Sequence, residues 1–160
     1  ESPSYTVVVA GRNLTTAAVT GVPVSIAVGT TTLNTPSNFI PMAASASAIV
    51  SGAVTNASNT PLTDAAVNAQ QVLSAGQRLD VAWTQVDPTT ATYGLSLPLA
   101  APIKASYVAS GPLVFSADAA AAGHYDILAS APGYTVQSTA PAVTLTVPDS
   151  VTTRDLVLAP

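Results

Sequence analysis

Residues 123–134, with the sequence GHYDILASAPGY, form a short β-rich segment with turn residues at both ends. Its side chains alternate between two faces, which predicts a β-strand with one face in a core. Pro132 presets its own φ and Gly133 adopts positive φ at little cost, so the pair fits the centre of a type II turn. Tyr125 and Tyr134 can each place a ring on the core and a hydroxyl at its edge. This segment predicts a β-sheet and indicates no particular reaction.

The same pattern of β-rich segments and turn residues recurs along the chain. Only residues 117–122, which are rich in alanine, favour a helical turn, and residues 34–47 are predicted to be a linker. Many short strands separated by turns predict an all-β fold, an antiparallel β-sandwich. Besides the strand in 123–134, the predicted strands are 5–10, 15–20, 22–28, 49–55, 66–72, 79–86, 93–98, 105–108, 113–116, 143–147 and 152–158.

The composition excludes several classes of partner. Charged residues make up 8% of the 160 residues, against about 25% in ordinary soluble domains, and the formal net charge is −4. Four Lys and Arg residues do not provide the basic surface that nucleic acid requires. The sequence has no cysteine and no apolar run of about 20 residues, so we predict neither disulfides nor a membrane span. It shows no signal peptide, and we expect a mature or excised fragment.

Four segments in order along the chain carry a family resemblance. Residues 49–67 (IVSGAVTNASNTPLTDAAV), 87–98, 123–134 and 152–158 together resemble the carboxypeptidase regulatory-like repeat, a prealbumin- or transthyretin-like sandwich. The resemblance covers roughly residues 48–160. It implies a prealbumin-like antiparallel β-sandwich from a secreted or surface protein of bacteria.

Two features depart from that family pattern. Asn59-Thr60 stands where the family has a glycine before the Pro-Leu pair, and asparagine tolerates the left-handed conformation. Residues 99–122 are additional, and we expect them to form an inserted hairpin. Residues 5–8 resemble residues 125–128, so the N-terminal strands look like the end of an earlier repeat. We therefore predict a tail of a preceding β repeat plus linker over 1–45 and the sandwich domain over 46–160.

The inventory of reactive side chains is small. His124 is the single histidine and lies at a strand entrance, where a solvent-facing turn residue is expected. The aspartates are scattered without Asp-x-Asp spacing, and no Gly-x-Ser-x-Gly elbow occurs. We therefore predict no catalytic residue, no cofactor and no metal site.

Trp83 and Tyr107 are the remaining candidates for contact with a ligand. On a strand over 79–86, regular alternation places Trp83 on one face with Leu79 and Val81, which predicts a buried core tryptophan. The alternative is an exposed sugar-binding platform. It requires Trp83 to lie beside Tyr107, which belongs to the inserted hairpin.

The resemblance implies a non-catalytic structural or interaction module, such as a spacer or an adhesion-type domain, in a larger extracellular or cell-surface protein. Its expected partners are other domains of the same polypeptide or surface proteins, with glycans as a further candidate. The alternative function is a carbohydrate-binding module. We do not expect an enzyme.

Overall fold

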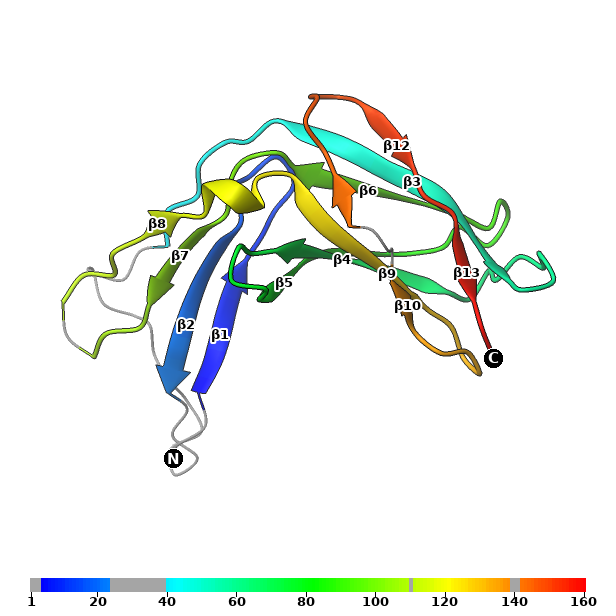
Figure 1. Cartoon of the computed structure of the whole chain (residues 1–160), viewed down its shortest axis with the longest axis horizontal. Coiled ribbons are helices and arrows are strands. Elements are labelled where there is room, and N and C mark those ends of the chain that lie inside the picture. The colour runs from blue at the N-terminus through cyan, green and yellow to red at the C-terminus, as the bar shows by residue number, and fades with distance from the viewer. Residues whose placement is uncertain (1–3, 24–39, 110, 139–141) are drawn as a thin grey trace.

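The computed structural model describes residues 4–23, 40–109, 111–138 and 142–160, and within them the chain is an all-β sandwich with a third sheet beside it (Figure 1). In Figure 1, β3 and β6 form an upper layer over β4, β5 and β9. The predicted strand 22–28 lies mostly outside the described residues. No helix among those described is long and apolar enough to cross a membrane.

The lower sheet has the order β10-β9-β4-β5, and β11 also pairs with β9. All of its pairings are antiparallel. The strand predicted inside 123–134 is its second member, and the strand predicted at 66–72 has the same bounds in the structure. The bounds are Gln137–Ser138 for β10, His124–Ser130 for β9, Ala66–Val72 for β4, Arg78–Gln85 for β5 and Val143–Thr144 for β11.

The upper sheet is organised on β3 (Ser47–Asn56), which pairs antiparallel with β6 (Thr92–Pro98). β12 (Val151–Thr153) and β13 (Leu156–Leu158) pair with β3 in succession, and both run parallel to it. The single strand predicted at 152–158 is therefore broken. At the break the Arg154 amide donates to the Ser51 carbonyl over 2.7 Å, and the Asp155 carboxylate accepts from the Ala53 amide over 2.8 Å.

The main core lies between these two sheets. Alternate residues of each strand point into it, as period-2 burial requires. The rings of Tyr93 and Tyr125 are buried in this core and Tyr134 packs against it. The core positions of Tyr125 and Tyr134 agree with the sequence prediction. Its largest members come from β3, β4, β6, β9 and the C-terminal strand and include Val50, Val54, Val67, Leu95, Leu97, Tyr125, Ile127 and Leu158.

A third sheet joins the N-terminal strands to the inserted segment. β1 (Ser4–Val9) pairs antiparallel with β2 (Ala17–Pro23), which pairs in parallel with β7 (Ile103–Ser106). β7 and β8 (Ser116–Ala117) form a hairpin in the inserted segment, as predicted, but with other bounds than the predicted 105–108 and 113–116. A 3-10 turn, η1 (Ala119–Ala121), follows it. Ala18 of β2 packs with Leu73, Leu79 and Ala121, so residues 4–23 contact the sandwich directly. The assignment of residues 1–45 to a preceding repeat stays a prediction.

Candidate functional site

The position of Trp83 corrects the sequence prediction. Its side chain is 70% exposed, whereas we predicted a buried core residue. Leu79, which simple alternation places on the same face, is buried. The two side chains therefore point to opposite faces of the lower sheet.

A β-bulge in β5 causes this change of face. Ala82 lies opposite Ala69 of β4, and Asp80 lies opposite Gln70, so Val81 has no partner across the ladder. One extra residue in a strand reverses the inward and outward positions beyond it. Ala82 consequently packs against the core, and Trp83 joins Asp80 on the outer face.

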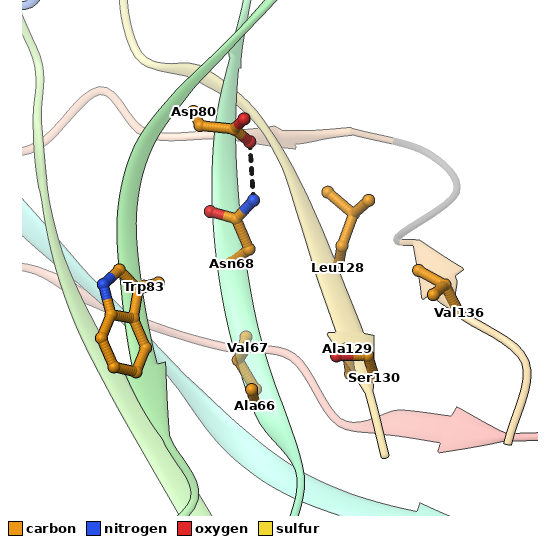
Figure 2. Close-up of a pocket in the computed structure, with 9 residues that line it drawn as sticks. All are labelled: Ala66, Val67, Asn68, Asp80, Trp83, Leu128, Ala129, Ser130 and Val136. Carbon is orange, nitrogen blue, oxygen red and sulfur yellow. Dashed lines mark hydrogen bonds between the residues drawn. The ribbon is translucent and has the colours of Figure 1, made fainter. Parts of the chain in front are cut away.

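The outer face of the lower sheet holds a groove of about 440 Å³ beside Trp83 (Figure 2). Figure 2 shows the indole and Asp80 on one strand, with Asn68 on the neighbouring strand and Leu128 beyond it. Val136, which is 61% exposed, contributes a further aliphatic wall. The complete lining is Ala66, Val67, Asn68, Asp80, Trp83, Leu128, Ala129, Ser130 and Val136.

Asp80 is the one charged residue among the described residues that line this groove. Its Oδ1 accepts hydrogen bonds from Asn68 Nδ2 at 2.6 Å and from Gln70 Nε2 at 2.8 Å. Both donors are neutral amides, so they hold the carboxylate in place without cancelling its charge. The next carboxylate on this face, Asp126, is paired with Arg78 at 2.6 Å. The groove therefore combines an exposed indole, aliphatic walls and one uncompensated negative charge.

Tyr107 does not belong to this site. It is half-buried and packs against Val19, Val22, Ala105 and Leu113, in a cluster of the third sheet. It is absent from the lining of the Trp83 groove. The side-by-side pair of rings that a sugar platform required is therefore not formed, because the hairpin that carries Tyr107 extends the third sheet instead of the lower one.

The other candidate residue, His124, begins β9. Its Nδ1 lies 3.2 Å from the hydroxyl oxygen of Thr144 on β11. Among the described residues, no group of three or more His, Cys, Asp or Glu side chains is placed to hold a metal ion.

Of the residues that line this groove, the sequence identified only Trp83 as a candidate, and it missed the hydrogen-bonded pair Asp80 and Asn68. In a strand over 79–86 without a bulge, alternation places Asp80 and Trp83 on opposite faces. The sequence pattern therefore does not predict that they share a site. The bulge alone brings them to one face.

Comparisons with known proteins found no matching family model and no matching curated protein. Among solved structures, the chain is similar to a hydroxyquinol 1,2-dioxygenase from Pseudomonas putida DLL-E4, with 12% identity and a TM-score of 0.44 over 72% of this chain and 57% of that one. It is similar to a 3-chlorocatechol 1,2-dioxygenase from Rhodococcus opacus 1CP, with 15% identity and a TM-score of 0.43 over 72% and 60%. A mutant catechol 1,2-dioxygenase from Acinetobacter radioresistens gives 15% identity and a TM-score of 0.39 over 71% and 52%.

These similarities correct two sequence predictions. We predicted a non-catalytic structural or interaction module, with a carbohydrate-binding module as the alternative, and we did not expect an enzyme. The three solved structures named above are enzymes rather than spacer, adhesion or sugar-binding modules, so both predictions are wrong as stated. The chain spans little more than half the length of these proteins, and at such identities and TM-scores their chemistry is not transferred to it.

Proposed function

We propose that this domain binds a small organic cation in the groove beside Trp83. The observation that carries the proposal is an exposed indole next to a carboxylate that only neutral amides accompany. A cation over the face of a tryptophan gains about 0.5–1 kcal/mol at an exposed site. A carboxylate nearby adds a charge contact of similar size.

The walls of the groove favour a cation with an apolar body. Leu128 and Val136 face the same space as the indole, and the volume of about 440 Å³ falls within the range of small-molecule sites. Quaternary ammonium groups satisfy these requirements, because their charge is spread over methyl groups that pack on aliphatic side chains. The two amide donors fix the Asp80 carboxylate before the ligand arrives, which lowers the ordering cost of binding.

Ligand-observed NMR titration with choline tests this function, since it detects weak complexes. Choline should bind, and its neutral isostere 3,3-dimethyl-1-butanol should bind much more weakly. Asp80→Asn should weaken choline binding by about two- to fivefold, from the loss of an exposed charge contact. Trp83→Ala should weaken it by about the same factor, from the loss of the cation–π contact.

Asp64→Asn is the matched control, because Asp64 is an exposed carboxylate outside the groove. It makes the same change in net charge and should leave choline binding unchanged. Equal binding of the neutral isostere, or equal weakening by Asp64→Asn and Asp80→Asn, would contradict the proposal.

We further propose that the chain belongs to a secreted or cell-surface protein, related to the carboxypeptidase regulatory-like repeat. The ordered motifs in residues 49–67, 87–98, 123–134 and 152–158 support this relation, as does the low content of charged residues, 8%. Fractionation of the source cells tests the location, because a cytosolic pool alone would contradict it.

A further inference from the structure

A second groove lies on the other side of Trp83. It has a volume of about 260 Å³ and runs between β5 and β6, with residues 10–12 at its border. Trp83 lines this groove as well as the first one. A ligand that packs on the indole therefore has access to both spaces.

The two grooves differ in charge. Arg12 is the one charged residue among those that line the second groove, as Asp80 is in the first. In the described part of the chain, the ion pairs join Arg78 to Asp126 and Lys104 to Asp118, and neither Arg12 nor Asp80 takes part in one. The indole thus lies between a carboxylate, that of Asp80, and a guanidinium, that of Arg12, and neither of these groups takes part in an ion pair.

Backbone groups add to the second groove. β5 has β4 as its strand neighbour and β6 has β3, and no described strand covers the other edge of either. Residues 81–84 and 94–96 line the groove along these open edges. Edge strands present unpaired N–H groups, which donate readily to an anion.

We infer that the ligand of this site is a zwitterion, with its cationic end beside Asp80 and its carboxylate end beside Arg12. The inference rests on the proposed cation-binding function and names the class of ligand for it. The body of such a molecule crosses the Trp83 indole. Charge complementarity at both ends selects it over a simple cation.

The test uses a series of trimethylammonio carboxylates of increasing chain length, each compared with its methyl ester by ligand-observed NMR. The ester keeps the cation and the chain but lacks the negative charge. At the length that spans the two grooves, the carboxylate should bind about two- to fivefold more tightly than its ester, as expected for an exposed charge contact. Arg12→Gln should abolish that preference and leave the affinity of the ester unchanged.

Gly94→Leu gives an independent test of the second groove. A Cβ at Gly94 meets no atom within 4 Å, so the backbone tolerates a side chain there, and that side chain fills part of the groove. This variant should weaken the binding of the carboxylate whose length spans both grooves, and it should leave choline binding unchanged. Arg154→Gln is the control for charge, because Arg154 is exposed and lines neither groove.

The outcomes separate the two proposals. If choline binds through Asp80 but no carboxylate binds better than its ester, the zwitterion inference is wrong and the cation-binding function stands. A preference that survives Arg12→Gln also contradicts the inference. If neither choline nor any member of the series binds, both proposals fail.

Discussion

The hydroxyl of Tyr93 donates a hydrogen bond of 2.7 Å to the backbone carbonyl oxygen of Arg154, 61 residues further along the chain. The same carbonyl lies only 2.0 Å from the position that a Cβ would occupy on Gly52. Gly52 and Tyr93 are opposite each other in the β3–β6 ladder. The C-terminal segment therefore crosses β3 where a glycine leaves room and a tyrosine supplies the donor.

Gly52→Ala should destabilise the domain strongly. The added methyl group would overlap a backbone oxygen, which cannot move aside as the end of a flexible side chain can. We expect a loss of about 3 kcal/mol or more in the free energy of unfolding, measured by urea denaturation. Gly94→Ala is the matched control on the paired strand, and it should change stability by less than about 0.5 kcal/mol because its Cβ meets nothing within 4 Å. Similar losses for both variants would contradict the close approach.

Tyr93→Phe should change how the stability of the domain depends on alkaline pH. Burial raises the pKa of Tyr93 to about 12, and the charge of Asp155 adds to this while Arg154 opposes it. Between pH 10 and that value the unfolded chain loses the proton and the folded chain keeps it, so stability falls as pH rises. Tyr93→Phe should cost about 1 kcal/mol at neutral pH, from the lost hydrogen bond, and should reduce the alkaline loss. Denaturation series at pH 7 and above pH 10 measure both effects. If wild type and Tyr93→Phe lost stability equally as the pH rises above 10, Tyr93 would not be the group responsible for the alkaline loss.

Asp118 connects the inserted hairpin to the turn between β4 and β5. Its Oδ2 accepts from Ser74 Oγ at 2.8 Å and from the Ser74 amide at 3.1 Å, with Lys104 Nζ at 3.5 Å. Burial acts to raise the pKa of Asp118, but the Ser74 hydrogen bonds and the Lys104 charge outweigh it and lower the pKa. This carboxylate therefore stabilises the fold above its unfolded pKa of about 3.9, and the contribution disappears as pH falls through the lower folded value.

Asp118→Asn should consequently lose stability at neutral pH, by roughly 1–3 kcal/mol for hydrogen bonds to a charged group. Its stability should then fall less than that of the wild type between pH 5 and pH 2. Asp64→Asn, which removes an exposed carboxylate, serves as the control in the same denaturation series. An acid dependence identical to that of the wild type would show that Asp118 is not a stabilising group.

The strands were predictable wherever alternation and turn residues agree. β4 has its predicted bounds, because Val67 and Ala69 alternate inward and the turn residues Ser74-Ala75-Gly76 follow it. A hairpin was expected in the inserted segment, but its strands are 103–106 and 116–117 instead of the predicted 105–108 and 113–116. The break at Arg154–Asp155 was not predictable from the local pattern, because it depends on how that segment meets β3 at Gly52. Nor did local periodicity show that β12 and β13 run parallel to β3, since parallel pairing depends on a long connection.

The site was the least predictable part, for one physical reason. A bulge inserts one residue without changing the composition of a strand, so nothing in residues 79–86 indicates that Val81 is unpaired. Trp83 was identified as a candidate but placed on the wrong face. Asp80, which shares the groove with it, was treated as one of the scattered aspartates.

The stability of Trp83→Ala distinguishes a bulged β5 from a regularly alternating strand. In a regular strand the indole is a core residue, and its loss costs about 3–5 kcal/mol. With the indole 70% exposed, the variant should lose less than about 1 kcal/mol in urea denaturation followed by circular dichroism. Leu79→Ala is the control on the same strand, and because Leu79 is buried it should lose about 2–5 kcal/mol. Trp83 is the single tryptophan, so wild-type emission should be red-shifted and readily quenched by iodide or acrylamide. Blue-shifted emission, together with a loss of about 3–5 kcal/mol in the free energy of unfolding for Trp83→Ala, would show that the indole is buried. Neither groove would then have an exposed tryptophan, and both proposals would fail.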